Sequence, residues 1–148
     1  MKFVIFLVLF VGLTTCEETT ENPLDNDKEK CIVELGLKRD EIIELDNLDF
    51  PPDSNSNYNK FVECDSKKKG LMSPKGEILF PEIKKMLLEV PEAKQLSKIT
   101  FNIYKHIISE ALRPCEEITL TTTDPGANMI RVYTCATKEI MKLKESLV

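Results

Sequence analysis

The number and positions of the cysteines constrain this chain more than any other feature of its sequence. The chain has five cysteines: Cys16 ends an apolar N-terminal segment, whereas Cys31, Cys64, Cys115 and Cys135 are spread over the remainder. An even number in a small secreted chain indicates disulfide bonds, and four cysteines allow three pairings. No cysteine pair has the two-residue spacing of a zinc knuckle and the chain has one histidine, so we expect no zinc site.

The N-terminal segment indicates the compartment. Lys2 precedes an apolar run from Phe3 to Leu13, far shorter than the roughly 20 residues that a membrane span needs. We interpret residues 1–16 as a signal peptide. We expect the mature chain, residues 17–148, to be secreted and to form a single domain with four cysteines, after a flexible leader over residues 17–24.

The charge and the motifs exclude several classes of function. The chain has 20 basic and 25 acidic residues and a formal net charge of −5, and such a surface repels nucleic acid and anionic lipid. The sequence contains neither a phosphate-binding loop nor a Gly-x-Ser-x-Gly nucleophile motif. We therefore expect no nucleic-acid partner, no membrane span in the mature chain and no cofactor.

Hydrophobic periodicity predicts an all-α fold. Six helices are expected, because apolar residues recur at helical spacing and the only β-leaning stretch, residues 117–123, lacks apolar partners for its threonines. The predicted helices cover approximately residues 25–36, 39–48, 58–69, 80–90, 92–112 and 124–147.

The helix predicted over residues 92–112 has the strongest pattern. Leu96, Ile99, Ile103 and Ile107 form one apolar stripe, which Tyr104, Ile108 and Leu112 widen. This pattern predicts a broad buried face.

Residues that could suggest catalysis or calcium binding lack the partners that such chemistry needs. The single histidine, His106, shares a helical face with Asn102 and Arg113, so we expect it to be solvated rather than catalytic or part of a pH switch. The stretch around Gly76 is similar to part of a calcium-binding loop, but Leu71 and Lys75 stand where carboxylates are needed. We expect neither enzymatic activity nor a metal site.

The run from Asn59 to Phe80 and the spacings around it resemble the insect odorant-binding protein family. That family has six cysteines, with the second and third four positions apart on one helix and the fifth and sixth nine apart on the last helix. Cys31, Cys64, Cys115 and Cys135 match the first, third, fourth and sixth. Lys60 and Gly126 fall at the second and fifth positions, which resembles the minus-C subgroup that lacks this bridge.

The resemblance implies a fold and a disulfide pairing. It implies a compact bundle of about six helices around an apolar cavity, with disulfides Cys31–Cys64 and Cys115–Cys135. In the chain-entropy model each bridge contributes roughly 3 to 4 kcal/mol. Lys60 and Gly126 would face each other, and the substitution Gly126→Cys is expected to be slightly stabilising because it removes the entropy cost of a glycine near a helix start.

The resemblance also implies the function of a carrier that binds and solubilises small hydrophobic molecules such as odorants or pheromones. A ligand that buries about 300 Å² of apolar surface would gain roughly 7 kcal/mol before ordering costs. A chemosensory receptor is a candidate partner, and the oligomeric state is left open. The alternative is a secreted glandular or venom interaction protein with a filled core. The candidate pocket residues are Leu45, Phe61, Met72, Ile83, Met86, Leu87, Ile99, Ile103, Ile107, Met129 and Tyr133.

Overall fold

The structure is a computed structural model, and it describes residues 25–117 and 122–146. Within these residues the chain forms seven α-helices and no β-strand, only an isolated bridge between Met72 and Ile78. The helices are α1 (Asn26–Glu34), α2 (Arg39–Asp46), α3 (Ser56–Lys68), α4 (Phe80–Leu88), α5 (Pro91–Lys94), α6 (Lys98–Glu116) and α7 (Pro125–Ser146). The all-α prediction is confirmed. The predicted signal peptide and leader lie outside the described residues.

Short polar side chains begin four of these helices. Each one accepts a hydrogen bond from a backbone N–H of the first turn, which would otherwise lack a partner. The donor–acceptor pairs are Lys28–Asp25 at 3.0 Å, Tyr58–Asn55 at 2.9 Å, Thr100–Ser97 at 3.2 Å and Ala127–Asp124 at 3.0 Å. Asn55 and Ser56 therefore belong to the start of α3, although the sequence pattern had placed them in the preceding loop.

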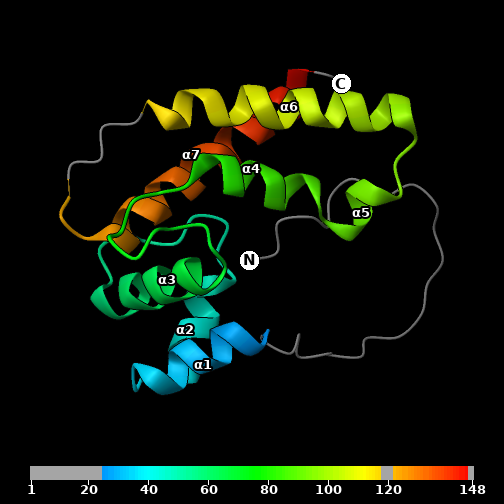
Figure 1. The fold of residues 1–148 in the computed structure, drawn as a ribbon. Coiled ribbons are helices and arrows are strands. Elements are labelled where there is room, and N and C mark those ends of the chain that lie inside the picture. Colours follow the sequence, from blue (N-terminus) through cyan, green and yellow to red (C-terminus); the bar gives the residue numbers. More distant parts are fainter. Residues whose placement is uncertain (1–24, 118–121, 147–148) are drawn as a thin grey trace.

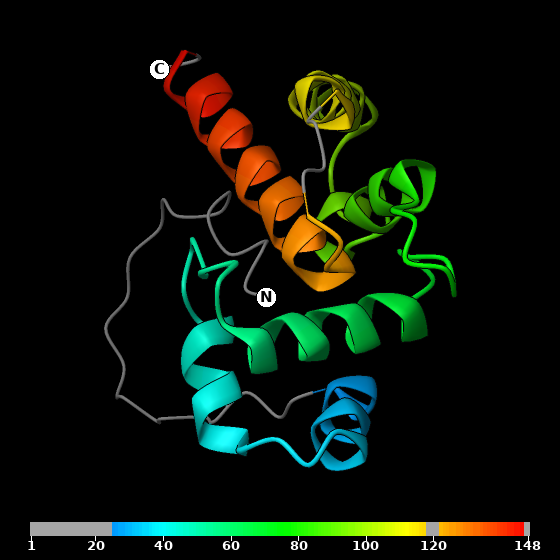
Figure 2. The same cartoon turned by 90° about the vertical axis from the view of Figure 1, so that its left-hand side faces the viewer.

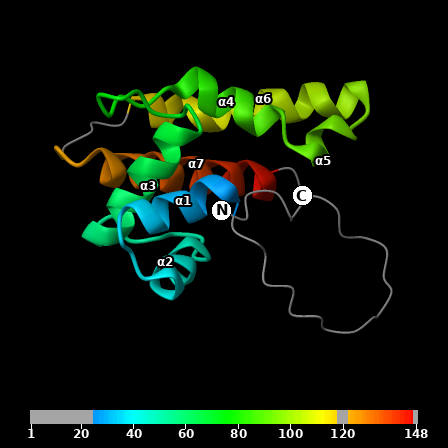
Figure 3. The same ribbon diagram turned by 60° about the horizontal axis from the view of Figure 1, so that its bottom comes forward.

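Helix α7 lies in the middle of the bundle, between two groups of helices (Figures 1 and 2). Helix α7 packs against α3 on one side and against α6 on the other, α1 and α2 contact the far side of α3, and α4 packs along α6. Figure 3 shows the same order, with α4 and α6 above α7 and the first three helices below it.

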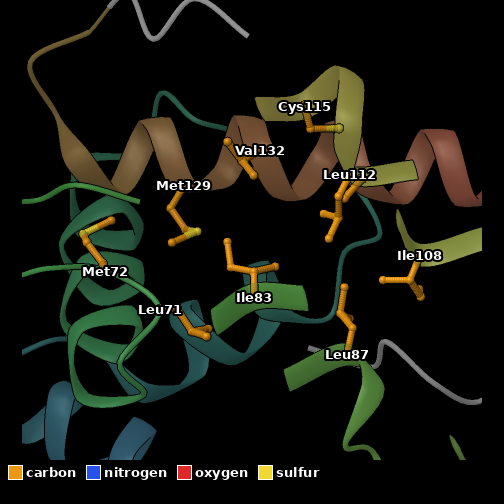
Figure 4. Packing of buried hydrophobic residues seen from close by; sticks show 10 residues of the cluster. Leu71, Met72, Ile83, Leu87, Ile108, Leu112, Cys115, Met129 and Val132 are labelled. Carbon is orange, nitrogen blue, oxygen red and sulfur yellow. The ribbon is translucent and has the colours of Figure 1, made fainter. Parts of the chain in front are cut away.

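The buried apolar residues form two clusters. The small cluster joins α1, α2, α3 and α7 and contains Cys31, Ile32, Ile42, Tyr58, Phe61 and Ile130. The large cluster joins the residues after α3 to α4, α6 and α7 (Figure 4) and contains Leu71, Met72, Ile83, Leu87, Ile108, Leu112, Cys115, Met129, Val132 and Ala136. Val62 of α3 packs against both clusters.

The helix predicted over residues 92–112 is two helices. Helix α5 ends at Lys94, and α6 begins after Ser97, whose hydroxyl accepts the Thr100 N–H. Helix α6 continues past Leu112 to Glu116 and contains Pro114 in its last turn. The apolar periodicity continued across the break, so it concealed the local capping signal at Ser97.

The inward face of α6 differs from the predicted one. The side chains of Ile99 and Ile103 are 75% and 53% exposed, whereas Ile108 and Leu112 are 2% and 1% exposed. The prediction that the stripe through Ile99 and Ile103 is buried was wrong. Figure 3 shows the reason: the N-terminal part of α6 extends beyond the end of α7, and among the helices that the structure describes only short α5 packs beside this part.

The two disulfides have the pairing that the resemblance implied. Cys31 of α1 bonds to Cys64 of α3 with a Cα–Cα distance of 5.9 Å, and Cys115 of α6 bonds to Cys135 of α7 with a distance of 5.8 Å. Each bridge thus ties together two helices that already pack against one another. This pairing is confirmed.

Contrary to the expectation from the sequence, the structure leaves no room for a side chain at Gly126. A Cβ atom at this position would lie 1.9 Å from the Asn59 carbonyl oxygen, because the start of α7 approaches the backbone of α3 very closely. The expectation that Gly126→Cys is slightly stabilising was therefore wrong, since contacts this short require the backbone to move.

Candidate functional site

An apolar cavity lies between the two clusters. Its walls come from α3, α4, α6 and α7, and the end of α2 and the loop that follows it close one side. Space that the centre of a water molecule can occupy amounts to about 60 Å³, and all the unfilled space between the atoms, part of it open to solvent, amounts to about 780 Å³. The lining residues are Asp46, Leu48, Pro51, Tyr58, Phe61, Val62, Asp65, Ser66, Leu71, Ile83, Met86, Leu87, Leu112, Met129, Ile130, Val132, Tyr133 and Ala136.

The smaller of these volumes limits the size of a ligand that could enter without movement of the walls. About 60 Å³ of water-occupiable space holds only a few waters, so a ligand of ordinary size would need the walls to move. Two methionines in the wall make such movement inexpensive, because their unbranched side chains change shape easily. Met86 comes from α4, and Met129 comes from α7 and points into the interior that Figure 4 shows.

The sequence-predicted pocket residues divide into three groups. Those that line the cavity are Phe61, Ile83, Met86, Leu87, Met129 and Tyr133. Leu45 packs against the small cluster and Met72 is buried in the large one, so both support the walls without lining them. On α6, Ile107 is half-buried and does not line the cavity, and Ile99 and Ile103 are exposed.

The sequence analysis missed the polar part of the wall. Asp46, Tyr58, Asp65 and Ser66 line the cavity on the side formed by α2 and α3, together with Tyr133 of α7. A signal was present for three of them. Tyr58, Asp65 and Ser66 recur at helical spacing with Phe61 and Val62, and so lie on the inward face of α3.

Charged side chains surround this polar wall, and Lys28, Asp46 and Asp65 among them are largely buried. The side chain of Lys28 is 8% exposed, and its Nζ lies 2.5 Å from Asp46 Oδ2. The Tyr58 hydroxyl donates to Asp46 Oδ1 at 3.2 Å. Lys69 Nζ lies 2.9 Å from an oxygen of Asp65 and 2.9 Å from one of Asp25. Burial of the Lys28–Asp46 pair adds little net stability, because the desolvation of both charges offsets much of their attraction.

The environment shifts the pKa values of these groups in different directions. Burial raises the pKa of Asp65, and the charge of Lys69 offsets only part of that effect. Burial also raises the pKa of Tyr133 to about 12. Burial by itself lowers the pKa of Lys28, but the Asp46 carboxylate outweighs it and the net shift is upward.

Among the described residues no group of three or more histidine, cysteine or acidic side chains could hold a metal ion. His106 is exposed on α6 and does not belong to the cavity wall. No helix of the described ranges is both long enough and apolar enough to cross a membrane.

Fold and site together define a class of protein: a disulfide-bonded helical bundle with an apolar cavity between its helices. The model of the PBP/GOBP family matches residues 14–139, so the chain belongs to this family of insect odorant-binding proteins. No match was found among curated proteins or among solved structures.

Proposed function

We propose that this protein is a secreted carrier that binds and solubilises small hydrophobic molecules in its internal cavity. The observation that carries the proposal is a largely apolar cavity, lined from four helices of a PBP/GOBP-family bundle. Helices α4 and α6 contribute only apolar side chains to it. Burial of an apolar ligand there would supply the binding free energy, and the methionines would allow ligands of different shapes.

We also propose that the chain belongs to the minus-C subgroup and that residues 1–16 are removed on secretion. Lys60 is exposed on α3, and Gly126 lies where a cysteine side chain would clash with Asn59. These positions therefore suit a member that has dispensed with the second bridge. The intact mass of the secreted protein tests both ideas: it should begin near Glu17 and contain no alkylatable thiol before reduction.

A fluorescent apolar probe, N-phenyl-1-naphthylamine, tests the carrier function. The purified, delipidated protein should bind the probe with micromolar affinity and release it when long-chain alcohols or esters are added. Absence of probe binding, and of any lipid extracted from the native protein into organic solvent, would favour an interaction protein with a filled core.

Two substitutions on α7 locate the binding site. Met129→Trp adds bulk inside the cavity and should weaken probe binding by about tenfold or more. Met141→Trp makes the same change at a residue that is 42% exposed and outside the cavity, and should leave probe binding unchanged. Circular dichroism confirms that both variants are folded. Equal probe affinity in both variants would place the binding site elsewhere.

A further inference from the structure

One carboxylate oxygen of the cavity wall has no hydrogen-bond partner among the described residues. Asp65 of α3 is 3% exposed and lines the cavity. Its Oδ2 accepts a hydrogen bond from Lys69 at 2.9 Å, whereas its Oδ1 is buried and accepts none. Because buried polar atoms in folded proteins almost always have a partner, an unpartnered acceptor on a residue that lines a cavity can take its donor from a bound molecule or from a water.

Polar groups are unevenly distributed around the cavity. Asp65, Asp46 and Tyr58 all lie on the side formed by α2 and α3. The opposite wall, from α4 and α6, consists of aliphatic and methionine side chains such as Ile83, Met86 and Leu112. A ligand that suits both walls has an apolar body and a polar group at one end.

The charges on the polar side decide which polar group fits. Lys28 is already paired with Asp46, and Lys69 is paired with both Asp65 and Asp25. Neither lysine is left to pair with a ligand carboxylate, and the Asp65 carboxylate itself lies in the cavity wall. A ligand carboxylate would therefore be repelled, whereas a hydroxyl group can donate its hydrogen to a carboxylate oxygen.

We propose that the cavity binds an apolar molecule with a terminal hydroxyl group, which donates a hydrogen bond to Asp65 Oδ1, and that it discriminates against the carboxylic acid of the same chain length. This inference rests on the proposed carrier function. It predicts that an alcohol binds better than an ester of the same length, because an ester accepts hydrogen bonds but cannot donate one.

Displacement of the naphthylamine probe by three matched ligands tests the proposal. The ligands are 1-octanol, methyl octanoate and octanoate, at about pH 8 where the acid is ionised. The wild-type protein should bind the alcohol about tenfold more tightly than the ester, and the acid most weakly, because a hydrogen bond to a charged acceptor is worth about that factor.

Two variants of Asp65 distinguish the effect of the hydrogen-bond acceptor from the effect of its negative charge. Asp65→Leu removes the acceptor, so the alcohol and the ester should bind with similar affinity. Asp65→Asn keeps an acceptor oxygen without the charge, so the alcohol preference should persist and the acid should bind more tightly. Asp40→Asn is the control, because it removes the same charge from an exposed position of α2 that does not line the cavity. It should change none of the ratios.

Each outcome distinguishes this inference from the proposed function. Equal wild-type affinities for alcohol and ester, or an alcohol preference that survives in Asp65→Leu, would overturn the inference and leave the carrier function standing. If neither the probe nor any ligand binds, the carrier function itself fails. Should Asp65→Leu not fold, the order of the three ligands in the wild type and in Asp65→Asn still decides the question.

Discussion

The two buried clusters, one on each side of the α3–α7 contact, are built in different ways. In the small cluster, short helices are held by a disulfide and by specific polar contacts, such as the buried Lys28–Asp46 pair and the Tyr58 hydroxyl. The large cluster also contains a disulfide, but its remaining members are apolar and include Met72 and Met129. Directional contacts specify one arrangement, whereas methionine-rich packing tolerates several. We infer that α2 and α3, held by α1, form the rigid side of the cavity, and that α4, whose Met86 lines the cavity, and α6 form its adaptable side.

Polar contacts join the start of α7 to α3. The Asn59 side-chain amide donates to Asp124 and to the Asp53 carbonyl, both at 2.9 Å, and Arg131 binds Asp53 at 2.6 Å. The Asp124 carboxylate also caps α7. Together with the close approach of Gly126, these contacts tie the start of α7 to α3 without a covalent bond.

Removal of either disulfide should have the largest effect on the free energy of unfolding. The two removals should affect different sides of the molecule. The double variants Cys31→Ala/Cys64→Ala and Cys115→Ala/Cys135→Ala should each lose roughly 3 to 4 kcal/mol of unfolding free energy, with the larger loss for the longer separation of 33 residues against 20. Urea denaturation measures this loss. Hydrogen exchange should accelerate mainly in α1 for the first variant and mainly in α6 for the second. Equal acceleration throughout the chain in both variants would contradict the division into two sides.

Substitution at the junction should have the next largest effect. Gly126→Ala should cost about 3 kcal/mol, because the added Cβ would lie 1.9 Å from the Asn59 carbonyl oxygen and α7 would have to move away from α3. Gly36→Ala is the matched control: this glycine has a φ of +61° and nothing within 4 Å of its added Cβ, so only the left-handed backbone opposes the change, at about 1 kcal/mol. Thermal denaturation compares the two variants. The idea of a close α3–α7 junction fails if Gly126→Ala costs no more than Gly36→Ala.

The smallest expected effect concerns the polar wall and its dependence on pH. Burial raises the pKa of Asp65 in the folded state, so its contribution to stability is fully present below its ordinary pKa of 3.8 and is lost as pH rises through the folded value. Asp65→Asn should therefore be more stable than the wild type near neutral pH, by about 1 kcal/mol or less, and this advantage should disappear in acid.

In the same measurement, Asp25→Asn should change the stability near neutral pH in the opposite direction. Burial opposes ionisation of Asp25, but the hydrogen bonds from Lys69 and from the Lys28 N–H outweigh it and lower its pKa. Its contribution is therefore present above pH 3.8 and is lost as pH falls through the lower folded value. Asparagine preserves the cap of α1, so only the charge changes. Thermal melting from pH 3 to pH 8 should show the two variants diverging from the wild type in opposite directions at high pH. If the two variants instead diverge from the wild type in the same direction, burial does not destabilise the ionised Asp65 carboxylate.

Helix positions and disulfide pairing could be predicted from this sequence because they depend on local or pairwise information. Caps such as Asp25 and Asp124 act within a single turn, and the cysteine spacing resembles a pattern whose pairing is known. Six of the predicted pocket residues also line the cavity, since Phe61 or Ile83 on an amphipathic helix has only one buried direction to face.

Only the tertiary structure decided which face of α6 points inward and which charges are buried. Apolar residues cover more than one face of α6, so its rotation depends on where α7 ends. Ile99 and Ile103 are exposed because, within the described part of the chain, no long helix packs beside them. Lys28 is buried because Asp46, from a different helix, offers it a partner. Asp65 is buried because the helices around α3 enclose it. The cost of burying a charge depends on neighbours that are distant in sequence, and local periodicity carries no information about them.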